Sequence, residues 1–366
     1  MHALKRFGTA FGGYKMMENY PVPECGPDDI ILEIKAAAIC GADMKHWGVD
    51  NGYDDTNITP DQQQSVRGHE FAGEIVKVGE NVKDWRIGQR VVSDNSAHVC
   101  GVCPACEQGD FLCCEHKVNL GLDNNTWGGG FSKYCKVPGE ILAIHKHAIW
   151  EIPEGIKYEE ACVLDPICNA YKAVAQQSHL IPGQDVVVFG TGPLGLFSVQ
   201  VAKLMGAVNI VMVGLDDDVK VRFGVAKELG ATHCVNGSKE DVVARCTEIC
   251  GRDNLGLVIE CSGANIALKQ AIEMTRPNAE IVRVGMGFKP LEFSINDITA
   301  WNKSIIGHMA YDSTSWRNCI RLLQSGQIKV QPMITHRLGL SQWQEGFDKM
   351  AKKEAIKVIF HYDYED

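Results

Sequence analysis

The stretch that decides the fold is Val186-Val187-Val188-Phe189, followed directly by Gly190-Thr191-Gly192-Pro193-Leu194-Gly195. The four apolar residues predict a buried strand, and the apolar segment after Gly195 has the character of a helix. In such a strand–turn–helix unit the first glycine permits a tight turn, the second lets a pyrophosphate approach the backbone, and the third lets the helix pack on the strand. The helix N-terminus supplies N–H donors to an anion. The stretch therefore predicts dinucleotide binding, with Gly190, Gly192, Pro193, Leu194 and Gly195 as cofactor residues.

The sequence around this turn alternates strand-like and helix-like segments. A β-branched run at 209–213 is followed by a helix-period segment at 219–229 and then by a second β-branched run at 257–260. This alternation is typical of parallel strands joined by crossover helices, so we predict a doubly wound α/β domain over residues 156–299. Residues 1–155 instead contain short β-rich runs between turn clusters and predict a mostly β domain.

The end of the second predicted strand bears on which dinucleotide is used. Gly214 would leave room for a 2′-phosphate, but Asp216, Asp217 and Asp218 follow it and would repel one. We therefore favour NAD over NADP, with Gly214, Asp216 and Asp217 as candidate contacts and a solvated turn as the alternative for one or two of the aspartates. Three residues at the ends of later strand-like runs complete the predicted cofactor site: Cys261, Val284 and Gly285.

Composition and charge narrow the class of partner. The chain has 366 residues, and its 36 basic and 46 acidic residues give a net charge of −10. That charge disfavours nucleic acid and acidic membrane surfaces, so small molecules are the expected partners. The sequence shows no secretory signal and no membrane-spanning apolar run, and it contains 15 cysteines, which together predict a reducing, cytoplasmic location.

Four of the cysteines have metal-ligand spacing. Cys100, Cys103 and Cys106 are separated by two residues each, and Cys114 follows after seven. Four thiolates on one short loop suit a closed tetrahedral Zn²⁺ site with a structural role, and an iron–sulfur cluster is the alternative. The neighbouring Cys113 is predicted to be a free thiol.

A second metal site is predicted from residues that lie far apart in the sequence. Cys40 and His69 each stand on a turn beside a β-rich run, and acidic residues occur at Glu70 and at Asp165. Taken singly, a buried cysteine or histidine is more often structural. Cys40, His69 and one carboxylate, from Glu70 or from Asp165, would hold zinc and leave a position for water or substrate. Such a zinc acts as a Lewis acid.

With these pieces together, the whole chain resembles the zinc-dependent medium-chain dehydrogenases of the alcohol dehydrogenase superfamily, in particular the branch of sorbitol, other polyol and threonine dehydrogenases. The resemblance rests on the residues and motifs already quoted and on further family motifs: Cys40-Gly41-Ala42-Asp43, Gly68-His69-Glu70 through Gly88-Gln89-Arg90-Val91, Gly129-Gly130-Phe131-Ser132-Lys133-Tyr134 and Asp165-Pro166. It implies a GroES-like catalytic domain, formed by residues 1–155 with 300–366 and carrying both zinc sites, and a Rossmann domain over 156–299. Chemistry would take place in the cleft between them, and the protein would be a homodimer or homotetramer.

Carried over position by position, the resemblance implies that Cys40, His69 and Glu70 are ligands of the catalytic zinc. Asp165 matches a further acidic ligand, direct or through water, and Asp43 resembles the carboxylate that orients the ligand histidine. Two departures affect the proton relay, because the family has a serine or threonine where Ala42 stands and a histidine where Lys45 stands. His46, Glu70, Asp165 or Lys45 could replace the relay, and Lys45 could instead contact the cofactor or an anionic substrate group. An exposed turn is the alternative for Lys45 and His46.

These observations predict an NAD(P)-dependent zinc enzyme that oxidises a secondary alcohol, with a polyol or sugar-derived alcohol as substrate. The polar stretch 43–61 suits such a substrate, with Trp47, Tyr53 and Trp127 as candidate walls. L-Threonine is the second candidate, because Asp165-Pro166-Ile167-Cys168-Asn169-Ala170 resembles threonine dehydrogenases. A zinc- and dinucleotide-binding regulator without catalysis is the third, since Ala42 lacks the relay hydroxyl.

Overall fold

The structure is a computed structural model that describes residues 1–6, 13–47, 65–123, 126–287 and 289–365. It divides into two compact units. One unit consists of Met1–Asp165, Asp312–Trp316 and Ile334–Asp366, and the other of Pro166–Tyr311 and Arg317–Met333.

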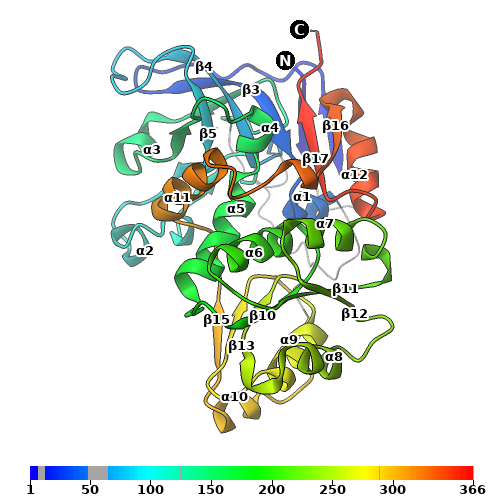
Figure 1. The fold of residues 1–366 in the computed structure, drawn as a ribbon. Helices are drawn as coiled ribbons and strands as arrows, with labels where there is room; N and C mark the ends of the chain where they lie inside the picture. Colours follow the sequence, from blue (N-terminus) through cyan, green and yellow to red (C-terminus); the bar gives the residue numbers. More distant parts are fainter. Residues whose placement is uncertain (7–12, 48–64, 124–125, 288, 366) are drawn as a thin grey trace. The chain divides into compact units, whose positions relative to one another are not determined.

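The second unit is built on a six-stranded parallel sheet in the order β12-β11-β10-β13-β14-β15 (Figure 1). Its strands are β10 (Asp185–Phe189), β11 (Ile210–Gly214), β12 (His233–Asn236), β13 (Leu255–Glu260), β14 (Glu280–Arg283) and β15 (Ser304–Gly307). Every residue of β10, β11 and β13 is buried, as expected for parallel strands covered on both faces. The predicted doubly wound α/β sheet is thus confirmed.

Helices cover both faces of this sheet (Figure 1). The helices α8 and α9 pack on one face around Val187, Val211 and Val258, and α6 and α7 pack together on the other. The helices of this unit, including those that begin or end in the other unit, are α5 (Leu164–Tyr171), a π-helical segment (Lys172–Gln177), α6 (Pro193–Leu204), α7 (Arg222–Leu229), α8 (Val242–Cys250), α9 (Asn265–Met274), α10 (Asn296–Ala300) and α11 (Ser313–Gln324).

The strand β15 differs from the predicted division of the chain, which placed residues 300–366 with the first domain. Val282 of β14 is the register partner of Ile306, so β15 is the sixth strand of the parallel sheet. The apolar pair Ile305-Ile306 gives this segment the same strand character as its neighbours. The return to the first unit therefore occurs beyond β15.

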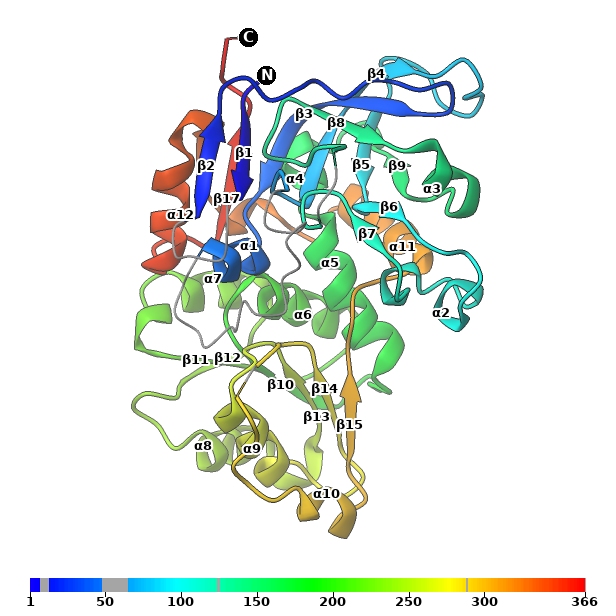
Figure 2. The ribbon, with the colours of Figure 1, turned by 180° about the vertical axis from the view of Figure 1, so that it is seen from behind.

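The first unit is mostly β, as predicted, and its main sheet has the order β16-β17-β3-β4-β5-β9, with β8 also paired to β3 (Figures 1 and 2). Its strands are β1 (Ala3–Arg6), β2 (Tyr14–Met17), β3 (Ile30–Ala38), β4 (Glu70–Val78), β5 (Arg90–Ser93), β6 (Ser96–His98), β7 (Val118–Asn119), β8 (Tyr134–Val137), β9 (Ile149–Glu151), β16 (Ile334–Gly339) and β17 (Lys357–His361). Its helices are α1 (Gly41–Trp47), α2 (Pro104–Glu107), α3 (Gly139–Ile144), α4 (Tyr158–Ala161) and α12 (Trp343–Ala351).

A core of aromatic and aliphatic side chains fills this unit. Phe131, Phe347 and Phe360 are buried and meet edge to face, with ring centroids 5.5–6.2 Å apart. None of the helices that the structure describes is long and apolar enough to cross a membrane.

Candidate metal centres and cofactor site

Strand register places three chemically active residues at one end of the sheet in the first unit. Ala38 of β3 is the partner of Glu70 on β4 and of Ile359 on β17. Cys40 lies two residues beyond Ala38, and Lys357 lies two residues before Ile359 on an antiparallel strand. The pairing therefore brings Cys40, Glu70 and Lys357 together although they are far apart in the sequence.

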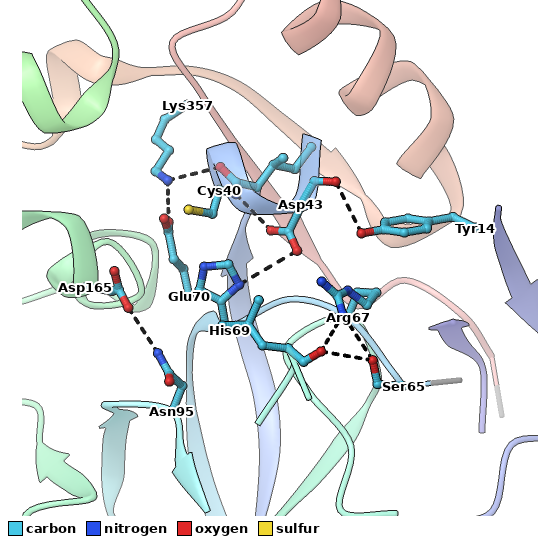
Figure 3. Close-up of polar contacts among 12 residues, drawn as sticks. Tyr14, Cys40, Asp43, Ser65, Arg67, His69, Glu70, Asn95, Asp165 and Lys357 are labelled. Carbon is cyan, nitrogen blue, oxygen red and sulfur yellow. Dashed lines mark hydrogen bonds and ion pairs between the residues drawn. The ribbon is translucent and has the colours of Figure 1, made fainter. Parts of the chain in front are cut away.

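Cys40, His69 and Glu70 form a cluster of possible metal ligands, with one donor atom of each within 4.8 Å of the others (Figure 3). His69 is brought there by the turn before β4, where Gly68 has φ +88° and a Cβ atom would meet the Phe131 ring at 2.6 Å. A side chain at position 68 would thus displace either the ring or the histidine. The sulfur, nitrogen and oxygen donors suit zinc and leave one of its usual four positions open.

Unpartnered polar atoms within the cluster fit a bound cation. The Oε1 atom of Glu70 and the Nδ1 atom of His69 are buried and form no hydrogen bond. The Asp43 Oδ1 atom is also buried without a hydrogen bond and lies 3.8 Å from His69 Nδ1. Because Asp43 faces Nδ1, Nε2 is the imidazole nitrogen left for a metal, and a small tightening would turn the Asp43 contact into an orienting hydrogen bond.

Charge is concentrated around Cys40. Burial and then the Glu70 carboxylate raise the pKa of the Cys40 thiol well above its ordinary value, Lys357 opposes this, and Asp43 and Asp165 add to it. A bound divalent cation would add a positive charge that favours the thiolate. The donor set is therefore suited to a divalent metal ion.

Lys357 is a buried partner of this cluster that the sequence did not indicate. Its side chain is 1% exposed, and its ammonium donates to the Glu70 Oε2 atom and to the Ile39 carbonyl, the latter at 3.0 Å (Figure 3). A lysine at the start of an apolar strand is ordinarily solvent-exposed, and only the pairing of β17 with β3 reveals its position. Lys357 holds one oxygen of Glu70 and leaves the unpartnered Oε1 for the metal.

Asp165 lies near this cluster but is not one of its three members. Its Oδ2 atom accepts a hydrogen bond of 3.1 Å from Asn95 Nδ2, in the turn between β5 and β6 (Figure 3). Asn95 is the second functional candidate that sequence analysis missed, since a single asparagine in a turn carries no distinctive pattern.

The residues considered for the proton relay lie on or beside α1. Lys45 is half-buried, and burial lowers its pKa while Cys40 acts in the opposite direction. The side chain of His46 and all of Tyr53 fall outside the described residues. Trp47 and Trp127 are partly buried and pack against the core of the first unit, which is the ordinary structural alternative for these rings.

The four predicted cysteine ligands lie together, and their sulfur atoms are all within 4.8 Å of one another. Cys103 is the residue before α2, Cys106 lies on that helix, and Cys114 ends the short turn after it. Backbone amides of the loop, beginning with that of Val102, lower the pKa of Cys100 to about 6. These amides favour the thiolate, and the all-sulfur donor set fits a closed zinc site. Cys113 is exposed, in contrast to the buried Cys114.

The glycine turn follows β10 as predicted and opens α6. Gly192 is the N-cap residue, Pro193 is the first helical residue, and Leu194 follows it. A Cβ atom on Gly195 would meet the Gly190 carbonyl oxygen at 1.8 Å, whereas one on Gly192 would meet nothing within 4 Å. The third glycine thus serves packing, and the second leaves open space in which a pyrophosphate fits.

The other predicted cofactor residues stand at the carboxyl ends of neighbouring strands. The Cys261 amide donates to Phe189, and the amides of Val284 and Gly285 both donate to the Glu260 carbonyl. In an open parallel sheet this edge is where ligands bind. The arrangement fits a dinucleotide.

The three aspartates after β11 differ in burial, and Asp217, like Asp216, is exposed. Asp218 is buried, accepts from the Leu215 amide at 2.8 Å and pairs with Arg222 at 3.4 Å, so it shapes the turn. Asp216 is exposed, and hydrogen bonds from Asn236 and Lys239 lower its pKa. Asp216 is thus an exposed carboxylate two residues beyond the end of β11. Gly214 is tightly enclosed, since a Cβ atom there would meet Thr191 at 2.6 Å.

Comparison with known proteins identifies the class. Residues 26–147 match the alcohol dehydrogenase GroES-like domain, and residues 193–325 match the zinc-binding dehydrogenase domain. The chain belongs to the zinc-type alcohol dehydrogenases, and the expected resemblance is confirmed.

Individual relatives span the whole chain. The YdjL protein of Escherichia coli K12, described as a zinc-type alcohol dehydrogenase-like protein, is 77% identical over 100% of both chains. A sorbitol dehydrogenase of Halalkalibacterium halodurans and an L-threonine 3-dehydrogenase of Bacillus velezensis are 30% and 31% identical, each over 98% of both chains. The solved structure of 2R,3R-butanediol dehydrogenase from Bacillus subtilis is 29% identical, with a TM-score of 0.83 and 99% coverage of both chains.

Proposed function

We propose that this chain is a zinc-dependent dehydrogenase that oxidises a secondary hydroxyl of a polyol or sugar-derived alcohol to a ketone, converting NAD⁺ to NADH and releasing one proton. The observation that carries the proposal is the Cys40–His69–Glu70 cluster, whose buried donors suit a metal with an open position. A protein that only sensed a dinucleotide would have no need of this cluster.

Each residue of the site has a role in this proposal. Cys40, His69 and Glu70 would hold the zinc ion, which when bound supplies a Lewis acid that favours the ionised form of an alcohol hydroxyl. Asp43 orients His69, and Lys357 fixes Glu70 by its ion pair. The protein thus contributes position and charge, and the cofactor accepts the hydride.

The proton must leave by a route that differs from the usual one, because Ala42 has no hydroxyl to begin a relay. Lys45 stands one turn later on α1 and is half-buried, and burial lowers its pKa while Cys40 acts in the opposite direction. Lys45 is therefore our candidate for the end of the relay.

Two further features support the choice of cofactor and the expected assembly. The exposed, ionised Asp216 would accept hydrogen bonds from ribose hydroxyls and repel a 2′-phosphate, which favours NAD. In the described sheet β15 is an edge strand, with Ile305 38% exposed, and an open edge of this kind invites pairing with a second copy. A homodimer or homotetramer is the proposed assembly.

L-Threonine is the second candidate substrate, supported by the Asp165-Pro166 to Asn169-Ala170 motif and by the similarity to L-threonine 3-dehydrogenases. The polyol proposal is supported by the similarity to a sorbitol dehydrogenase and a 2R,3R-butanediol dehydrogenase, whose names are those of compounds with adjacent hydroxyls. A non-catalytic regulator is the third candidate, supported only by Ala42.

The test is the initial rate of NAD⁺ and NADP⁺ reduction by zinc-loaded protein with four- to six-carbon polyols, their phosphates, sugar acids and L-threonine. We expect reduction of NAD⁺ with a polyol, lost on chelation and restored by zinc. If L-threonine were the one substrate oxidised, it would replace the polyol as the proposed substrate. Tight dinucleotide binding without turnover on the whole panel would favour the regulator.

A further inference from the structure

We propose that Asn95 is a positioning residue that holds Asp165 beside the Cys40–His69–Glu70 cluster and outside its set of metal ligands. The inference rests on the proposed function, because it concerns the same metal site. It assigns a role to a residue in the turn between β5 and β6 and distinguishes between the two carboxylates, Glu70 and Asp165, that sequence analysis left as alternatives.

The turn that carries Asn95 is held from several sides. Asn95 is 3% exposed and adopts a left-handed backbone with φ 60°. Its backbone N–H donates to Ser93 Oγ at 2.9 Å, and its backbone carbonyl accepts from the backbone N–H of Leu120 at 2.7 Å. Ser93 Oγ in turn donates to the Ala148 carbonyl at 3.2 Å. An asparagine adopts this conformation at little cost, and its side chain is presented from a fixed backbone.

The Asn95 side-chain amide contacts Asp165 directly. Asn95 Nδ2 donates to Asp165 Oδ2 at 3.1 Å, and the carboxylate does not join the three donors that lie within 4.8 Å of one another (Figure 3). Glu70, by contrast, is held within the cluster by Lys357. Glu70 thus has a cationic buried partner in Lys357, Asp165 has the neutral Asn95 amide among its contacts, and only Glu70 belongs to the group of three possible ligands.

The consequence is a division of roles between the two carboxylates. Glu70 completes the metal ligands, and Asp165 provides a fixed negative charge next to them. A neutral amide holds a carboxylate in place without cancelling its charge, whereas a lysine or arginine at position 95 would cancel it.

The decisive variants are Asn95→Gly and Asp165→Asn. Glycine removes the amide but accepts the left-handed backbone, so Asn95→Gly releases Asp165 with little strain on the turn. Asn95→Asp is the second variant, because it keeps the shape of the side chain and repels Asp165. The matched control is Asn278→Gly, since Asn278 has φ 58° and its side chain contacts Asn302 rather than a carboxylate.

Zinc affinity and the visible spectrum of the Co²⁺-loaded protein are the measurements. Cys40→Ser loses the metal of the Cys40–His69–Glu70 cluster, so its Co²⁺ spectrum is that of the four-cysteine site alone. This spectrum is subtracted from the spectrum of the wild type and of each variant. We expect Asp165→Asn to bind Zn²⁺ within about threefold of the wild type, whereas loss of a true ligand or its partner costs about tenfold or more. We expect Asn95→Gly and Asn95→Asp to change the Co²⁺ spectrum because the released carboxylate reaches the metal. The change should vanish in Asn95→Gly combined with Asp165→Asn, and Asn278→Gly should match the wild type.

Two results would overturn the inference. A loss of tenfold or more in Zn²⁺ affinity in Asp165→Asn would make Asp165 a ligand. An unchanged Co²⁺ spectrum in both Asn95 variants would show that Asn95 does not restrain the Asp165 carboxylate. Failure of the proposed function is recognised separately by the rate assay, because the wild type would then reduce neither NAD⁺ nor NADP⁺ with any substrate of the panel, whatever the Asn95 variants do.

Discussion

The two metal clusters of the first unit are assembled in different ways. The four cysteines come from the 15 residues between Cys100 and Cys114, so one short loop contains the whole site. Cys40, His69 and Glu70 meet only because β3, β4 and β17 pair in a particular register. The four-cysteine site has four identical sulfur donors, no open coordination position and ligands close in the sequence. The other site has sulfur, nitrogen and oxygen donors, an open position, and ligands that meet only in the folded sheet. The comparison teaches that a structural metal site can be encoded by spacing, whereas a reactive one needs the sheet around it.

The largest expected effect separates the two clusters by function. Cys40→Ser should lower turnover at least about a thousandfold, because several kcal/mol of transition-state stabilisation depend on the metal, while the melting temperature stays close to that of the wild type. Cys103→Ser should instead lower the melting temperature by about 5 °C or more. Turnover, zinc content and thermal unfolding are measured on both. Equal losses of melting temperature would contradict the assignment of one catalytic and one structural site.

The second prediction concerns the dependence of the open cluster on its surroundings. Lys357→Met should destabilise the metal-free protein by about 3–5 kcal/mol, because Glu70 is left buried without a cation. The cost should be smaller with zinc bound, since the ion offsets the carboxylate. Urea unfolding with and without zinc measures both values.

Lys303→Met is the control for Lys357→Met. Lys303 is also buried, but its ammonium donates to the Ile272 carbonyl. We expect a loss of about 1 kcal/mol that is independent of zinc. A zinc-independent cost in Lys357→Met as well would mean that the ion pair serves the fold and not the metal site.

The same contrast explains how far the sequence could predict this protein. The cysteine spacing and the glycine turn are local patterns, and both lie in the structure as expected. Lys357 and Asn95 could not be found, because a lysine at the start of a strand and an asparagine in a turn acquire their roles only from residues distant in the sequence. The assignment of β15 failed for a related reason, since strand character does not state which sheet a strand joins.

The third prediction tests how the open cluster orients its histidine. Asp43→Asn should weaken zinc binding about 10- to 100-fold and lower kcat, because the charge that faces His69 Nδ1 is removed. The control is Asp94→Asn, which alters another buried carboxylate–histidine pair of the same unit, Asp94 with His145 at 2.6 Å, neither of which is a predicted metal ligand. Zinc affinity is measured by competition with a chelator. Comparable weakening in both variants would indicate a general effect of buried charge.

The smallest expected effect sharpens the description of the closed cluster. Cys113 is exposed, whereas its neighbour Cys114 is buried and its sulfur lies 3.6 Å from that of Cys100. Cys113→Ser should therefore leave two zinc ions per chain and change the melting temperature by less than about 2 °C, because a surface substitution away from a ligand has little effect on stability. Cys114→Ser, made alongside it, should lose one zinc ion. If Cys113→Ser were the variant that lost zinc, the loop would bind metal in a register one residue shorter, and spacing alone would then be too coarse to define even the local site.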